Sequence, residues 1–208
     1  DTAAPDTLIF ARGSDAHKLD PADVDDGESV NTLAQICEGL VRFRSGTHEI
    51  EPALAESYEI SDDGLTYTFR LRPGVKFHDG TALDAEAAIW SFQRQMDPQH
   101  PGHFPDAAFS YWVSLYQDVE AVRAVDPMTI EFPLRQPNAS LLASLAIFPA
   151  FLVSPQALET HGADFQRHPV GTGPYRFVKW TPNQTIVLAK NEDYWDRPRA
   201  PQFERLVI

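Results

Sequence analysis

The chain has 208 residues, enough for one large domain or two small ones, and 43% of them are hydrophobic. Its formal net charge of -13 at pH 7 excludes a protein that binds nucleic acid through a basic face. The same charge excludes a polybasic membrane-surface protein.

The N-terminal part is predicted to form a strand, a loop and a helix. Residues 7–11 are an apolar run typical of a short buried strand, and turn residues follow at Gly13, Ser14 and Asp15. Residues 18–27 are polar, with four aspartates, and are expected to form a loop. Apolar residues then recur at the spacing of one helix face, at Val30, Leu33, Ala34, Cys37, Leu40 and Val41.

A hairpin and a capped helix are predicted next. Residues 57–60 form a strand, 62–64 give a strong turn signal, and apolar side chains alternate over 67–71. Asp84 is expected to cap the helix that follows, because its side chain can accept a hydrogen bond from the first turn. The apolar face of this helix comprises Ala85, Ala88, Ile89 and Phe92.

The middle of the chain predicts an irregular loop, a second hairpin and two helices. Residues 100–107 are rich in proline, glycine and histidine and are expected to be irregular. The segments 118–125 and 128–134 flank an Asp-Pro turn signal, which favours a hairpin. A short helix is expected over 141–147, and Ser154 with the proline after it indicates another helix start.

The C-terminal segment is predicted to contain a glycine turn and three strands. Glycines at 171 and 173 are expected to permit positive φ in a tight turn, and strands are expected over 175–180, 185–190 and 203–208. Together the elements indicate a mixed α/β (α+β) fold with hairpins and few βαβ crossovers.

No metal or cofactor is expected from the motifs. Seven histidines are present, and His100 and His103 have a ligand-like spacing, but the proline and glycine between them argue against helical geometry. Neither an HExxH nor a paired CxxC motif occurs. These histidines are therefore interpreted as exposed loop residues.

Catalysis is not expected either. No GxSxG motif occurs, and the lone thiol, Cys37, falls on the predicted apolar helix face, which favours an inert core cysteine. The glycine turn lacks the lysine of a phosphate-binding loop and precedes a strand, so phosphate binding is not expected.

Aromatic residues are the remaining candidates for binding. Such side chains line small-molecule cavities, but they also fill hydrophobic cores, and both roles stay open for them. The candidates are Phe109, Tyr111, Trp112, Phe148 and Phe151.

One long motif and several shorter ones go beyond composition. Residues 52–80 read PALAESYEISDDGLTYTFRLRPGVKFHDG. Further motifs are TALDAE at 81–86, WSFQRQ at 90–95, PVGTGPY at 169–175 and NEDYW at 191–195. In this order they resemble the family 5 solute-binding proteins, the dipeptide-, oligopeptide- and nickel-binding components of ABC importers.

The resemblance implies a bilobed fold, of which this chain would be the N-terminal lobe, with a mixed sheet, hairpins and flanking helices. Residues 1–45 and 165–208 would form the main lobe, and 46–164 an inserted subdomain. The second lobe is expected to be absent from these residues, leaving an incomplete bilobed fold. Because no signal-peptide pattern is present, we expect a periplasmic protein whose signal peptide has been removed.

The resemblance also implies a function. The protein would be a monomeric, non-enzymatic receptor that captures a short peptide by noncovalent lobe closure and delivers it to a membrane permease. Gly13, Ser14 and Asp15 match a position near the ligand cleft of relatives, as does the segment with Phe109, Tyr111 and Trp112. Alternatives are the same fold with another solute, namely a nickel chelate, haem or an oligosaccharide, or a peptide hydrolase.

Overall fold

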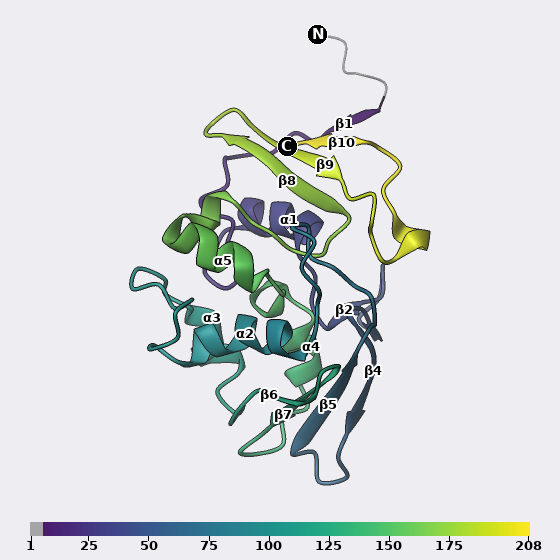
Figure 1. Ribbon diagram of the computed structural model, residues 1–208, viewed down its shortest axis with the longest axis vertical. Coiled ribbons are helices and arrows are strands. Elements are labelled where there is room, and N and C mark those ends of the chain that lie inside the picture. The colour runs from purple at the N-terminus through teal and green to yellow at the C-terminus, as the bar shows by residue number, and fades with distance from the viewer. Residues whose placement is uncertain (1–5) are drawn as a thin grey trace.

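A computed structural model describes residues 6–208 as a mixed α/β fold with three sheets (Figure 1). The elements in chain order are β1 (Thr7–Ile9), α1 (Gly27–Ile36), β2 (Val41–Phe43), β3 (Ile50–Pro52), β4 (Ala55–Ile60), β5 (Thr66–Leu71), α2 (Ala85–Met96), α3 (Ser110–Leu115), β6 (Arg123–Asp126), β7 (Thr129–Pro133), α4 (Leu141–Leu145), the 3-10 helix η1 (Phe148–Ala150), α5 (Pro155–His161), η2 (Gly162–Arg167), β8 (Tyr175–Thr181), β9 (Thr185–Lys190), η3 (Arg197–Arg199) and β10 (Arg205–Val207).

The first sheet joins the two ends of the described chain. Its strand order is β1-β10-β9-β8, with β1 parallel to β10 and the other pairs antiparallel. It lies at the upper end of the molecule in Figure 1, and α1 lies beneath it. Leu33 and Ile36 of α1 belong to the same buried cluster as Leu188 and Leu206 of the sheet, so burial of one helix face holds α1 in place.

The second large sheet is antiparallel and lies at the opposite end (Figure 1), with strand order β4-β5-β7-β6. Phe69 and Phe132 from its inner face meet Phe92 of α2. The ring centroids of Phe69 and Phe132 are 5.5 Å apart, and those of Phe92 and Phe132 are 5.0 Å apart, in edge-to-face contacts that favour packing of helix on sheet.

The hydrophobic core falls into two clusters. One collects residues between 16 and 37 and between 153 and 206, and the other collects residues between 40 and 152. A buried ion pair links them, because Arg94 of α2 reaches Asp20 with an Nη1–Oδ2 distance of 3.0 Å. The predicted division at residues 46 and 164 stays a prediction. The clusters separate between residues 37 and 40 and between 152 and 153, so Ala157 and Leu158 of α5 pack with the terminal segments.

Most of the expected local structure is confirmed. The two hairpins correspond to the antiparallel pairs β4–β5 and β6–β7. The Asp84 carboxylate accepts a hydrogen bond from the Ala87 N–H at 2.8 Å, and the Ser154 hydroxyl accepts one from the Ala157 N–H at 3.1 Å, so both predicted caps are present.

Three predictions at the N-terminal end are wrong. The strand expected to be buried is exposed, with Ile9 62% and Phe10 52% accessible, because β1 is an edge strand that pairs only with β10. The helix expected to continue to residue 41 ends at Ile36, since the backbone of Cys37 is extended and β2 begins at Val41. Ala34, expected on the buried face, is exposed.

Glycine is required at positions 171 and 173 for a different reason than expected. Neither Gly171 nor Gly173 has positive φ. A Cβ atom at Gly171 would lie 2.3 Å from the carbonyl oxygen of Ile36, and one at Gly173 would lie 2.7 Å from that of Gln35. These glycines therefore permit close approach to the end of α1, not a left-handed backbone.

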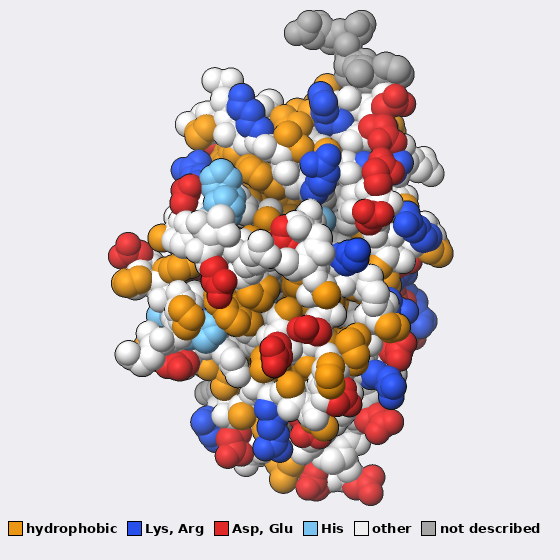
Figure 2. All heavy atoms as spheres, in the orientation of Figure 1, with side chains coloured by type: hydrophobic (Ala, Val, Ile, Leu, Met, Phe, Trp, Pro, Cys, Tyr) orange, Lys and Arg blue, Asp and Glu red, His pale blue; other side chains and the backbone are white. Residues whose placement is uncertain are grey.

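Within residues 6–208, no helix combines the length and apolar character needed to cross a membrane. Lysine and arginine side chains are scattered among acidic ones on the face shown in Figure 2 and do not gather into one basic area there.

Candidate functional site

The loop that follows β1 is held in place by Asp15. Its carboxylate forms an ion pair with Arg12 and accepts hydrogen bonds from the Trp180 indole N–H at 3.2 Å and the Asn183 backbone N–H at 2.6 Å. Burial opposes ionisation of Asp15, but these hydrogen bonds and the Arg12 charge keep its pKa below the ordinary value. Asp15 thus ties the loop to the β8–β9 hairpin and leaves Gly13 and Ser14 exposed beside it.

The aromatic segment at the start of α3 divides between core and surface. Phe109 is buried, with a left-handed backbone at φ 41°, and its ring lies 4.8 Å from that of His103. Trp112 is also buried and stacks on Tyr116 at 4.9 Å. Tyr111 alone of the three predicted residues is half-buried, and it meets Phe148 edge-to-face at 5.0 Å. Phe109 and Trp112 therefore pack in the core, and Tyr111 remains accessible.

A small hollow brings Tyr111 to the loop after β1. It has a volume of about 60 Å³, and Lys18, Asp23 and Asp25 line it opposite Tyr111. Asp23 fixes this arrangement, because it pairs with Lys18 at 2.6 Å and accepts the Ala108 backbone N–H at 2.8 Å. Among residues 6–208, no hydrogen bond or ion pair joins 13–15 directly to 109–112.

A larger, mostly apolar hollow of about 300 Å³ lies between α1 and the carboxyl ends of β1 and β10. Phe10 and Ile208 line its strand side, and Glu28 and Asn31 line its helix side. The Gly13 N–H donates to Glu28 Oε1 at 3.1 Å, which connects this hollow with the loop. Open α/β sheets bind ligands at this place, outside the carboxyl ends of parallel strands.

A buried carboxylate fastens the C-terminal motifs to the end of α1. Glu38 accepts hydrogen bonds from the Thr172 hydroxyl at 3.0 Å, the Tyr194 hydroxyl at 2.7 Å and the Trp195 indole N–H at 2.8 Å. Burial raises the pKa of Glu38, and the three donors oppose that rise. The motifs at 169–175 and 191–195 thus meet at one acceptor, which gives them a structural role.

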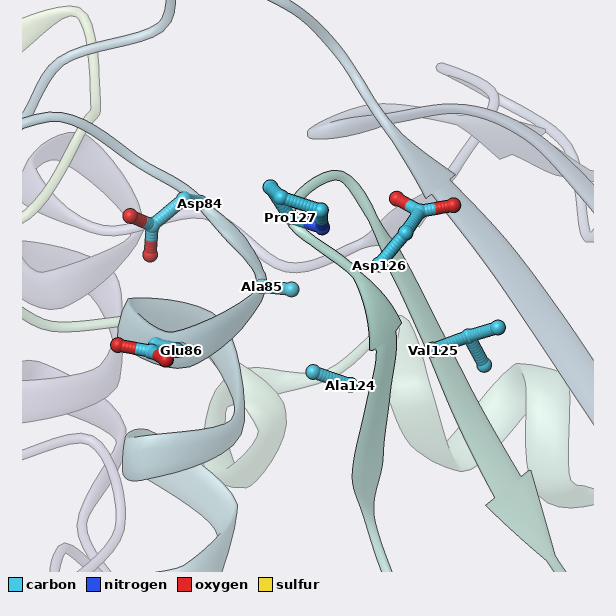
Figure 3. Close-up of a pocket in the computed structure, with 7 residues that line it drawn as sticks. All are labelled: Asp84, Ala85, Glu86, Ala124, Val125, Asp126 and Pro127. Carbon is cyan, nitrogen blue, oxygen red and sulfur yellow. The ribbon is translucent and has the colours of Figure 1, made fainter.

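A third hollow, of about 440 Å³, lies between the start of α2 and the β6–β7 turn (Figure 3). Asp84 and Asp126 line it, but their carboxylates point away from each other. Each already accepts a backbone N–H, from Ala87 at 2.8 Å and from Met128 at 2.7 Å. These side chains therefore do not converge on a common ligand position.

Comparison with known proteins decides the family. The model of "Bacterial extracellular solute-binding proteins, family 5 Middle" matches residues 49–208. The chain belongs to this family. The resemblance stated from the sequence motifs is thereby confirmed, and the motif at 52–80 forms β4, β5 and their flanking turns in this family 5 protein.

Named relatives bind different solutes. Heme-binding protein A of Haemophilus influenzae is 36% identical over 222 residues, which cover 100% of this chain and 40% of the relative. Glutathione-binding protein GsiB of Pectobacterium atrosepticum is 38% identical over 193 residues, covering 93% of this chain and 36% of the relative. The chain therefore spans well under half the length of these curated relatives.

A solved structure agrees in fold. The periplasmic binding protein DppA from Helicobacter pylori, in complex with the peptide STSA, superposes with a TM-score of 0.90 at 37% identity. The match covers 97% of this chain and 42% of that protein. The described residues thus form part of a periplasmic-binding-protein fold.

Several residues of these sites escaped sequence reasoning. Glu28 was missed because a lone glutamate in a helix carries no motif, and Glu38 because its partners lie more than 130 residues away along the chain. The aspartates of 18–27 were assigned only to a loop. Their number, four in ten residues, was the available signal.

Proposed function

We propose that this chain forms most of one lobe of a periplasmic solute-binding protein, which captures a short peptide and delivers it to the permease of an ABC importer. The observation that carries the proposal is the family match, joined to a TM-score of 0.90 against a periplasmic binding protein solved with a peptide. The proposed role is binding and not catalysis. The single thiol, Cys37, is buried, and burial raises its pKa, which makes it a poor nucleophile.

The open edge of β1 supports the proposal of a larger fold. Leu8, Ile9 and Phe10 form an apolar run, yet all three are exposed. One edge of β1 has no strand partner within the described residues. An apolar edge strand normally requires cover. Because the relatives are more than twice as long, we assign this cover to the rest of the polypeptide, with 46–164 as a subdomain inserted into the lobe.

The proposed ligand wall combines the loop and Tyr111. Gly13 and Ser14 are exposed, and their backbone groups, apart from the Gly13 N–H that donates to Glu28, can hydrogen-bond an extended peptide. The Tyr111 ring offers an apolar face with a polar tip. Asp15 contributes by holding the loop in place, since its carboxylate oxygens already interact with Arg12, Trp180 and Asn183. Phe109 and Trp112 support Tyr111 from the core. The wall is completed by lobe closure, and one bound solute per monomer is proposed.

The ligand class is tested on the full-length protein. Native mass spectrometry should reveal a co-purified peptide, and tryptophan fluorescence should titrate with a library of di- to tetrapeptides. Peptide binding is refuted by a co-purified haem, metal chelate or sugar together with no response to peptides. Catalysis is tested in the same samples, because a hydrolase would shorten the library peptides.

The ligand wall is tested by substitution. Tyr111→Ala should weaken peptide binding by about tenfold, the loss expected from one aromatic contact. Val113→Ala is the matched control, because Val113 lies on the same helix and is 73% exposed. Equal affinities of the two variants contradict the proposed wall and leave the family assignment intact.

A further inference from the structure

Three metal-ligating side chains converge beside the start of α1. They are His17 and Asp25 from the loop and Asp26, the residue that caps the helix. One nitrogen or oxygen of each lies within 4.8 Å of the others. The His17 Nδ1–Asp26 Oδ2 distance is 3.6 Å, which is too long for a hydrogen bond.

Ser29 holds the backbone of His17 and the side chain of Asp26. Its hydroxyl accepts the His17 backbone N–H at 2.9 Å, and its own backbone N–H donates to Asp26 Oδ1 at 2.8 Å. Asp26 therefore uses one oxygen as the helix cap and presents the other, Oδ2, toward the imidazole. Partners that fix the free atom of a ligating group are typical of metal sites.

The charges of this group are uncompensated. Among the described residues, neither Asp25 nor Asp26 pairs with a lysine or arginine, because nearby Lys18 pairs with Asp23 at 2.6 Å. Asp26 Oδ2 is buried and has no hydrogen-bond partner. A buried carboxylate oxygen without a donor is unfavourable, and a cation in contact with it removes that penalty.

We infer that His17, Asp25 and Asp26 bind a divalent transition-metal ion of the zinc type. Ligand bonds of about 2.0–2.2 Å in a tetrahedral site place ligand atoms roughly 3.3–3.6 Å apart. The His17–Asp26 pair already has this spacing. The other two separations, each no more than 4.8 Å, involve Asp25, whose exposed side chain can rotate toward the pair.

The ligand set determines the class of ion. An imidazole with two carboxylates suits zinc and similar transition ions, whereas calcium requires six or more oxygen ligands. The start of α1 carries roughly half a positive charge, which opposes a cation, but two full carboxylate charges exceed it. Three protein ligands leave at least one coordination position open for an outside donor.

The test is calorimetric titration of the metal-free chain with zinc ions. One ion should bind per chain, and His17→Ala should weaken its binding by tenfold or more, as loss of a direct ligand does. Asp26→Asn should weaken it similarly without unfolding α1, because asparagine caps helices as well as aspartate. His48→Ala is the control, since His48 is exposed and lies outside the group.

The outcomes are distinct. Loss of the one-to-one site in the His17 and Asp26 variants, with His48→Ala unchanged, supports the inference. Equal zinc binding by the chain and by His17→Ala means adventitious binding at other histidines and overturns it. Calcium binding that matches zinc binding in strength also overturns it, because an acidic patch alone then accounts for the ion. Circular dichroism of each variant separates ligand loss from unfolding.

Discussion

The environment of His78 predicts that protonation of its imidazole in acid destabilises this chain. His78 Nε2 lies 2.9 Å from the Gly173 carbonyl oxygen, so Nε2 carries the proton of the neutral ring. The other nitrogen, Nδ1, is buried and has no partner. Protonation would place a charge and an unpaired N–H in the protein interior. Burial accordingly lowers the pKa of His78 from 6.5 to about 4, aided by the Arg176 charge and opposed by the Gly173 hydrogen bond and Asp79.

The sign and size of the effect follow from linkage. Between these two pKa values the unfolded chain binds more protons than the folded chain, so the stability contributed by His78 is complete above pH 6.5 and is lost as the pH falls toward 4. The loss amounts to about 2 kcal/mol at pH 5 and about 3 kcal/mol at pH 4. Glu38, whose pKa is raised, contributes in the opposite direction over acidic pH, so the absolute curve alone does not isolate His78.

A matched substitution isolates the contribution of His78 to the pH dependence of stability. His78→Gln removes the titrating group and keeps an N–H that can reach Gly173, whose oxygen also accepts the Asn191 side-chain amide at 3.0 Å. Urea unfolding followed by tryptophan fluorescence, at pH 7 and at about pH 5, should show about 2 kcal/mol less acid destabilisation in the variant. The reasoning is refuted if the two proteins lose the same free energy of unfolding between these pH values.

Three further predictions concern the core. Arg94→Met should lower the free energy of unfolding, measured by urea titration, by about 3–5 kcal/mol, because it leaves the Asp20 carboxylate buried and unpaired. Adding Asp20→Asn to this variant should recover part of the loss. Gly171→Ala should cost about 3 kcal/mol or more in thermal unfolding, since its Cβ would collide with backbone, whereas Gly27→Ala meets no atom and should cost nothing. Cys37 should react with a coloured thiol reagent only after denaturation, and rapid labelling of the native chain would contradict its burial.

Local patterns carried most of the correct structural predictions. The alternation of apolar and polar residues over 67–71 identifies β5, because a strand with one buried face has a period of two. Asp84 and Ser154 mark helix starts, since capping depends on residues within one turn. Fold class followed from these elements and from the family motifs.

The wrong predictions concern positions whose structure depends on residues far away in the sequence. The apolar run of β1 suggests burial, but its exposure depends on which strands flank it, and these come from the other end of the chain. The glycines at 171 and 173 were assigned to turn geometry, whereas the neighbouring backbone of Gln35 and Ile36 requires them. The accessibility of Tyr111, beside the buried Phe109 and Trp112, does not follow from residue type, and the left-handed backbone of Phe109 has no signal in the sequence.

The parallel pairing of β1 with β10 also bears on how the chain folds. Thr7 is opposite Arg205 and Ile9 is opposite Val207, so this pair joins residues about 200 positions apart and is expected to form slowly. The hairpins β4–β5 and β6–β7 involve neighbours in sequence and form without that wait. The sheet of β4 to β7 and α2 are therefore expected to form first, and the strand that leads into the proposed binding loop is expected to dock last.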